Sequence, residues 1–261
     1  MPAVALTHGM FAWTDLIAHD PADAKDFYGA LFGWQPTALP DQPASAYTLF
    51  TINGQRVAGL TQMSETMKGQ GVLPMWVSYI LVDDIDAVVQ RVESLGGSIQ
   101  LPPMDIEDSG RMSMIADPSG GSVCLWQAGT HGGAECFNDP GCMSWNELLS
   151  RDPDAAAGFY AELLGWTYQP MDLGEQGIYQ VCMAEGRPNG GIMAMPKMIP
   201  DHVPPHWDVY FTVEDVDTAA ARVADLGGQI VVPPTDISVG RFSYVADRQG
   251  GHFTMFRPSE T

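Results

Sequence analysis

The stretch WTDLIAHDPADAKDFYGALFGW, residues 13–34, recurs 132 positions later as WNELLSRDPDAAAGFYAELLGW, residues 145–166. The two stretches are identical at 10 of 22 positions without a gap. The similarity continues between YILVDDIDAVVQRVESLGGSIQLPPMDI (79–106) and YFTVEDVDTAAARVADLGGQIVVPPTDI (210–237), and between GRMSMIADPSGG (110–121) and GRFSYVADRQGG (240–251). A repeat of this length predicts two copies of one folding unit.

Each copy contains the pattern of a strand followed by a helix, and this pattern occurs twice. In the first copy, residues 11–18 predict a strand, and Asp20 followed by Pro21 predicts the start of a helix. Apolar residues then recur at helical spacing up to Gly33, which suits a helix end. The order restarts with a predicted strand at 76–82, a helix at 84–95 and further strands. The chain is therefore expected to consist of four strand–helix–strands modules.

The 261 residues are 45% hydrophobic, enough for one large domain or for two of ordinary size, each with its own core. The formal net charge of −20 repels phosphate and anionic lipid, so we expect neither nucleic acid nor a membrane as partner. No apolar stretch approaches the roughly 20 residues of a membrane-spanning helix, and no secretory signal pattern is present.

Four cysteines are too few for a disulfide framework in a chain of this length. A cytoplasmic location with reduced thiols is therefore expected. The alternative is a disulfide between Cys136 and Cys142 under oxidising conditions, because these two cysteines are close in sequence.

Taken in order, the DP…FY…LFGW helix, the VDDID…LGG strand–helix and the DPSGG…LW hairpin resemble the vicinal oxygen chelate superfamily. That superfamily includes glyoxalase I, bleomycin-resistance proteins and extradiol dioxygenases. The doubled layout with WNELL is similar to a bacterial two-domain glyoxalase-like subgroup labelled hydroxylase. The resemblance implies an α+β fold with two tandem glyoxalase-like domains, at 8–127 and 142–258, joined by a Gly-rich linker at 128–141. Each domain is expected to contain paired βαβββ modules whose mixed β-sheet curves around a pocket.

The enzymes of this superfamily bind a divalent metal in that pocket through His, Gln or Glu side chains, with positions left open for substrate. The usual ligands lie on the first strand, on the strand before the second helix and on the last strand. In this sequence those positions hold Trp13, Val77 and Cys124 in the first copy, and Trp145, Asp208 and Thr254 in the second. Because few of these residues ligate metals, we expect no metal at the usual positions.

A shift along the strands offers a second hypothesis. Residues two apart on a strand face the same side, so Glu147, Asp208 and His252 could converge. Two carboxylates and one imidazole would suit Fe, Mn, Zn or Ni. The alternative is that Glu147, like Asp15 in the first copy, is a buried acid paired with a backbone N–H or an arginine, and that His252 is a half-buried polar residue.

Arg111 and Arg241 begin equivalent strands in the two copies. One interpretation is a structural ion pair with Asp117 and Asp247, respectively. The other is an anchor for an anionic ligand, since a guanidinium grips a carboxylate with two hydrogen bonds.

Two functions from different classes remain open. One is a lyase, isomerase or oxygenase in which Glu147 moves a proton. The other is a metal-free protein that binds and sequesters a small organic molecule. The predicted pockets are lined by Trp13, Asp15, Tyr47, Tyr79 and Cys124 in the first copy, and by Trp145, Glu147, Tyr179, Asp208, Tyr210, His252 and Thr254 in the second. A third reading is a subunit-interface role in which one copy is purely structural. The first copy has fewer polar pocket residues and would be that structural copy. The partner is expected to be a small molecule, and the chain either a monomer with an internal pseudo-dimer or a homodimer.

Overall fold

The computed structural model describes residues 5–38 and 47–259. The strands and helices follow the predicted repeat. The first half contains β1 (Phe11–Ala18), α1 (Pro21–Phe32), β2 (Gln35–Ala38), β3 (Tyr47–Ile52), β4 (Gln55–Gln62), α2 (Glu65–Gly69), β5 (Met75–Leu81), α3 (Ile85–Val92), β6 (Ser98–Ile106), β7 (Gly110–Ala116) and β8 (Ser122–Ala128). The second half contains β9 (Met143–Ser150), α4 (Pro153–Leu164), β10 (Thr167–Asp172), β11 (Ile178–Ala184), β12 (Arg187–Ala194), β13 (His206–Thr212), α5 (Val216–Asp225), β14 (Gln229–Ile237), β15 (Gly240–Ala246) and β16 (His252–Pro258).

The local signals for α1 act as the sequence predicts. The Asp20 carboxylate accepts a hydrogen bond from the Ala22 amide at 2.9 Å, and Pro21 fills the first helical position. Gly33 ends the helix at φ 74°, a left-handed conformation that suits a residue without a Cβ. The same signals frame α4, between Asp152 and Gly165.

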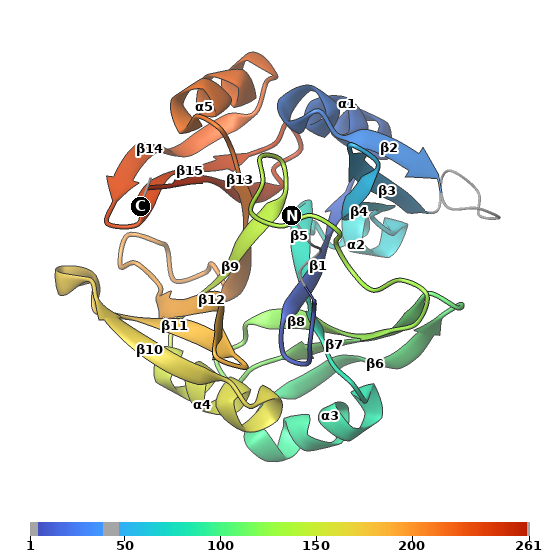
Figure 1. Cartoon of the computed structure of the whole chain (residues 1–261), viewed down its shortest axis with the longest axis vertical. Helices are drawn as coiled ribbons and strands as arrows, with labels where there is room; N and C mark the ends of the chain where they lie inside the picture. The colour runs from blue at the N-terminus through green and yellow to red at the C-terminus, as the bar shows by residue number, and fades with distance from the viewer. Residues whose placement is uncertain (1–4, 39–46, 260–261) are drawn as a thin grey trace.

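Each half forms one mixed, curved sheet, and the single pair His206–Ser122 between β13 and β8 joins the two into one 16-stranded sheet of the described residues. Its strand order is β2-β3-β4-β1-β5-β8-β7-β6 in the first half and β10-β11-β12-β9-β13-β16-β15-β14 in the second. The pairs β1–β4 and β5–β8 are parallel, and the central pair β1–β5 is antiparallel. The two sheets lie back to back, each curving away from the other, with α1 and α5 along one side and α3 and α4 along the other (Figure 1). The predicted α+β class, with a curved mixed sheet in each of two repeated halves, is therefore confirmed.

The helices pair across the two halves, and the main apolar core is shared between the halves. A single apolar cluster spans the interface, and the ring of Phe32 lies 5.4 Å from that of Phe211. The Tyr28 hydroxyl on α1 donates to Asp247 of the second half at 2.9 Å, and the Tyr160 hydroxyl on α4 donates to Asp117 of the first at 3.2 Å. One tyrosine on α1 and one on α4 thus each bond to an acid of the other half, so the two halves form an internal pseudo-dimer.

Asp117 and Asp247 bind these tyrosines and are not the partners of Arg111 and Arg241, so that prediction is wrong. Arg111 binds Asp86 on α3 at 2.6 Å and Asp105 on β6 at 2.9 Å, rather than Asp117. Arg241 binds Asp217 and Asp236, both at 2.8 Å, rather than Asp247. Because Asp105 and Asp236 lie directly opposite the arginines on the neighbouring strand, the guanidinium groups tie each helix to an outer strand.

A disulfide bond closes a short loop at the end of the linker. Cys136 and Cys142 form a disulfide with Cα atoms 5.7 Å apart, which corrects the expectation of free thiols for this pair. Cys124 and Cys182 are free and buried. Within the two described ranges, no helix combines the length and apolar character needed to span a bilayer.

Candidate functional site

The concave face of each sheet forms a cup lined by alternate residues of its central strands. In the first cup, Trp13, Val77, Tyr79, Cys124 and Trp126 form a small apolar cluster separate from the main core. In the second cup the equivalent residues are Trp145, Asp208, Tyr210, Thr254 and Phe256. The strands therefore place the predicted pocket residues of each copy on one surface.

The first cup is built around the carboxyl group of Asp15, which is 7% exposed. Three side chains donate hydrogen bonds to it: Trp13 Nε1 at 2.8 Å and Tyr47 Oη at 2.6 Å to Oδ1, and Tyr79 Oη at 2.7 Å to Oδ2. Burial raises the pKa of Asp15, and the donated hydrogen bonds oppose that rise. The interpretation of Asp15 as a buried, hydrogen-bonded acid is correct in kind, but its partners are aromatic side chains rather than an arginine.

The second cup repeats this arrangement with a longer acid. Glu147 accepts a hydrogen bond from Tyr210 Oη at 2.9 Å and another from Tyr179, whose hydroxyl in turn accepts from Trp145 Nε1 at 2.7 Å. Gly191 makes room for Tyr179, because a Cβ there would overlap the tyrosine hydroxyl. Burial raises the pKa of Glu147, and the tyrosine hydrogen bonds oppose the rise.

The second cup differs from the first by an additional acid. Asp208 lies directly opposite Glu147 on the neighbouring strand, where the first cup has Val77 opposite Asp15. Thr254 Oγ1 donates to Asp208 Oδ2 at 2.5 Å. Burial raises the pKa of Asp208 to about 8, and the charge of Glu147 adds to the effect. At neutral pH, Asp208 is therefore mostly a neutral carboxylic acid next to a second carboxyl group.

The linker covers the first cup. His131 lies with its ring 4.5 Å from Trp13, Ala134 packs into the apolar cluster, and Glu135 forms a 2.7 Å ion pair with Arg56 on β4. Trp13 is consequently only 3% exposed. In the second cup the equivalent Trp145 is half-buried, as are Glu147, Tyr179 and Tyr210. The second cup is therefore the more accessible of the two.

The hypothesis of a three-ligand metal site is not supported. His252 is exposed and stacks on Tyr244 with ring centroids 5.4 Å apart, and it does not join Glu147 and Asp208. In the described part of the chain, no group of three or more His, Cys, Asp or Glu side chains is placed to hold a metal ion. The two adjacent carboxyl groups in the second cup and the fully hydrogen-bonded Asp15 in the first do not fit the superfamily's His- and Glu-based ligand set.

The structure adds residues that the sequence did not identify. Tyr244 and Phe242 on β15 face the second cup, and His131 covers the first. The strand period of two would have placed both β15 residues on the face of Thr254. The position of His131 carried no signal, because it lies in a linker without periodicity.

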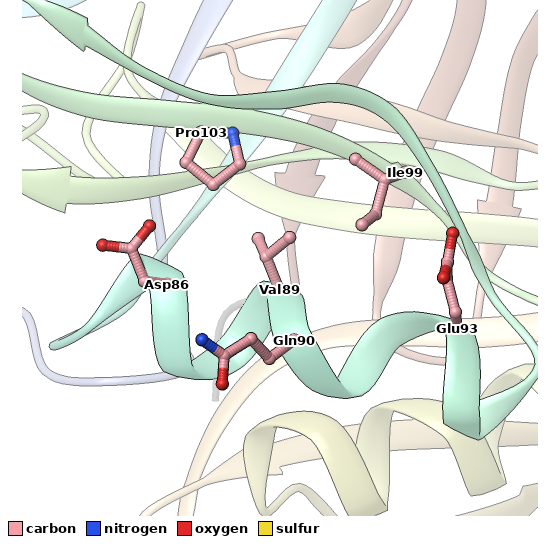
Figure 2. A pocket seen from close by; sticks show the side chains of 6 residues that line it. All are labelled: Asp86, Val89, Gln90, Glu93, Ile99 and Pro103. Atoms are coloured by element: carbon pink, nitrogen blue, oxygen red, sulfur yellow. The ribbon is translucent and has the colours of Figure 1, made fainter.

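One further depression lies away from both cups. A groove of about 250 Å³ lies between α3 and β6. Figure 2 shows the side chains that line it: Val89, Ile99, Pro103, Gln90 and the acids Asp86 and Glu93. Asp86 is already paired with Arg111. This groove contributes nothing to the site.

Two back-to-back halves, each curving a mixed sheet around an acid, define a tandem glyoxalase-like protein. Residues 10–125 match the model of the glyoxalase/bleomycin resistance protein/dioxygenase superfamily, and residues 147–256 match that of the glyoxalase-like domain. The chain is 43% identical over 252 residues to "Putative glyoxylase CFP32" of Mycobacterium tuberculosis, covering 95% of this chain and 94% of that protein. It belongs to the glyoxalase/bleomycin resistance protein/dioxygenase superfamily.

One further curated protein and two solved structures are also similar to the chain. The anthracycline biosynthesis protein DauV of Streptomyces sp. (strain C5) is 34% identical over 258 residues, covering 95% of this chain and 92% of that protein. Among solved structures, the 2,3-dioxygenase LapB from Pseudomonas sp. KL28 superimposes with a TM-score of 0.67 at 14% identity, covering 98% of this chain and 94% of LapB. The Mn(II)-bound glyoxalase from Novosphingobium aromaticivorans superimposes with a TM-score of 0.64 at 18% identity, covering 95% of this chain and 82% of that glyoxalase chain. At these identities the two structures show a shared fold.

Proposed function

We propose that the chain binds a small carbonyl compound in the second cup and moves a proton on it, using Glu147 and Asp208 and no metal ion. The observation that carries this proposal is the pair of adjacent carboxyl groups in the more accessible cup, where burial raises the pKa of Asp208 to about 8. Two carboxyl groups in environments that keep one ionised and one protonated form a general base and a general acid.

The hydrogen bonds assign the two roles. Burial raises the pKa of Glu147, but the hydrogen bonds that Tyr179 and Tyr210 donate to it oppose that rise, so we assign Glu147 as the base. Asp208 is the acid, because its pKa of about 8 keeps its proton at neutral pH. Glu147 would take the proton from the carbon next to the carbonyl while the C–H electron pair forms a C=C bond. Asp208 would give its proton to the carbonyl oxygen, forming an enol. Return of a proton from Glu147 to the same carbon, and of the enol proton to Asp208, would regenerate the carbonyl compound with its α-proton exchanged for one from solvent.

The comparisons support a small organic substrate but do not identify it. The relatives named above are a glyoxalase, a 2,3-dioxygenase and an anthracycline biosynthesis protein, names that refer to chemistry on small molecules. We also propose that the protein is located in the cytosol and is a monomer or a homodimer. Thiol trapping during extraction would test that location, because the Cys136–Cys142 link is of a kind that persists in oxidising compartments.

The second candidate function is binding without catalysis. It is favoured by the aromatic wall of the second cup, where Trp145, Tyr179, Tyr210 and Tyr244 are all half-buried. Large aromatic faces with a few converging polar groups are typical of small-molecule pockets.

The test is exchange of α-protons for deuterium in D2O, followed by NMR over a panel of small ketones and aldehydes. We expect wild-type protein to accelerate exchange of at least one compound and Glu147→Gln to reduce the rate by about 100-fold or more. Asp15→Asn is the matched control, since it alters the equivalent acid in the covered cup and should retain the rate. No exchange with any compound, or equal rates in Glu147→Gln, would refute proton transfer. Saturable quenching of tryptophan fluorescence without exchange would then favour the binding function.

A further inference from the structure

The charge of the second cup limits the kind of molecule that it can hold. On β9, β13, β15 and β16, alternate residues face this cup. They are Trp145, Glu147, Leu149, His206, Asp208, Tyr210, Phe242, Tyr244, His252, Thr254 and Phe256. None of these residues is Lys or Arg. Partial loss of hydration lowers the pKa of His252, so its ring is mostly neutral at pH 7.

The arginines of the same sheet lie outside the cup. Arg241 and Arg257 are each adjacent in sequence to a phenylalanine that faces the cup, so both lie on the opposite face of the sheet. Arg241 pairs there with Asp217 on α5 at 2.8 Å. Arg187 at the start of β12 binds the Ala5 carbonyl oxygen at 3.1 Å. The cup therefore offers no guanidinium group to an anionic ligand.

The carboxylate of Glu147 makes the cup unfavourable for an anion. Glu147 is half-buried, and charges in such a place are screened by salt much less than charges in open solvent. A ligand carboxylate would lose part of its hydration on entering and would meet a like charge. The cup therefore favours an uncharged ligand.

Most hydrogen-bond donors of the cup are already used within the protein. Tyr179 and Tyr210 donate to Glu147, and the Thr254 hydroxyl donates to Asp208 at 2.5 Å. A ligand with many acceptor oxygens, such as a sugar or a phosphate ester, would find few donors here. A ligand with a single acceptor and an otherwise apolar surface fits better.

Tyr244 provides a donor that is not used. This side chain is half-buried, its ring stacks on His252 with centroids 5.4 Å apart, and its hydroxyl forms no hydrogen bond within the part of the chain that the structure describes. Burial raises the pKa of Tyr244, and the charge of Asp208 adds to the effect, so the hydroxyl keeps its proton. Tyr244 lies opposite Thr254, which binds Asp208. Because Thr254 lies between them, Tyr244 and protonated Asp208 can donate to the same ligand oxygen.

We propose that the substrate of the second cup is an uncharged aromatic ketone, whose carbonyl oxygen accepts hydrogen bonds from Tyr244 and Asp208. Its rings lie against the aromatic side chains of Trp145 and Phe242. Two donors at the carbonyl oxygen stabilise the negative charge that develops there when the neighbouring carbon loses its proton. This inference rests on the proton-transfer function proposed above and names the class of its substrate.

The first test is isothermal titration of the full chain with 1-tetralone-6-carboxamide and 1-tetralone-6-carboxylate, two ketones of similar shape that differ in charge. At pH 7 we expect the carboxamide to bind about 10-fold or more tightly than the carboxylate. In Glu147→Gln, which lacks the repelling charge, the ratio should fall below about 3-fold. Asp15→Asn is the matched control, because it alters the equivalent acid in the covered cup and should keep the wild-type ratio.

The second test concerns the carbonyl oxygen. A third ligand has a CH2 group in place of the ketone carbonyl of 1-tetralone-6-carboxamide, and wild type should bind it about 10-fold more weakly than the ketone. Tyr244→Phe should weaken binding of the ketone about 10-fold and leave binding of the CH2 analogue unchanged. A merely structural role of Tyr244 would weaken both ligands alike. Circular dichroism and thermal melting establish that each variant is folded.

Three results would overturn the proposal: equal or tighter binding of the carboxylate by wild type, no saturable binding of the uncharged ketone, or equal losses for the ketone and its CH2 analogue in folded Tyr244→Phe. If Tyr244→Phe does not fold, the comparison of the three ligands on wild type still decides. Deuterium exchange separates this inference from the proposed function. Exchange without preference for the uncharged ketone would overturn the substrate class alone, whereas that preference without exchange would support the class and refute proton transfer.

Discussion

Replacing Asp208 by Asn should remove a specific pH dependence of stability. The folded protein holds a proton on Asp208 up to about pH 8, whereas the unfolded chain releases it near the ordinary value of 3.8. Between these two values the folded state binds the additional proton, so the free energy of unfolding falls as pH rises and becomes level above pH 8. At 1.36 kcal/mol per pH unit, the contribution lost between pH 5 and pH 9 is about 4 kcal/mol.

This loss is measurable as a shift in melting temperature. A chain of this size has an unfolding entropy of roughly 0.5 kcal/mol/K, so about 4 kcal/mol corresponds to about 7 °C. Melting curves of wild type and Asp208→Asn at pH 5, 7 and 9 should therefore converge or cross as pH rises, since the asparagine does not titrate. Because other carboxyl groups titrate equally in both proteins, the difference between the two curves isolates Asp208. Asp208→Val, matching Val77 of the first cup, should behave like the asparagine variant. Parallel curves for wild type and both variants would refute the raised pKa and, with it, the acid role of Asp208.

Two further outcomes follow from the internal symmetry. Tyr28→Phe and Tyr160→Phe should each lower the free energy of unfolding in urea by about 1–3 kcal/mol, because Asp247 or Asp117 loses a buried hydrogen bond. The two losses should add, since the sites are separate. A much smaller loss would show that these hydrogen bonds between the halves do not stabilise the shared core. Gly191→Ala should displace Tyr179, lower the free energy of unfolding by about 1–3 kcal/mol and alter the fluorescence of Trp145. Gly158→Ala on α4, where an added Cβ meets open space, should be neutral or stabilising by up to about 1 kcal/mol. Equal stability of the two variants would contradict the close approach at Gly191.

Much of the site could be predicted because strands have a period of two. Once Trp145 is placed on the concave face, Glu147 must share it, and the same rule puts Asp208 with Tyr210. The rule fails for His252, which lies on the correct face but near the strand end, where it is exposed and stacks on Tyr244. Alternation gives the face of a side chain but not its depth in the cup. It also gave no partner for Asp15, whose acceptors are satisfied by tyrosines on two other strands.

The sequence by itself determined the repeat, the order of strands and helices, and the absence of the usual metal ligands, because these depend on local spacing and residue type. Only the tertiary structure decided how the halves combine: α1 packs with α5 and α3 packs with α4 across the interface, and Tyr28 and Tyr160 bond to acids more than 200 and 40 residues away, respectively. It also decided that the linker closes the first cup and leaves the second more open. Such contacts join residues far apart in the chain, and their register follows from the packing of the whole core rather than from any local pattern.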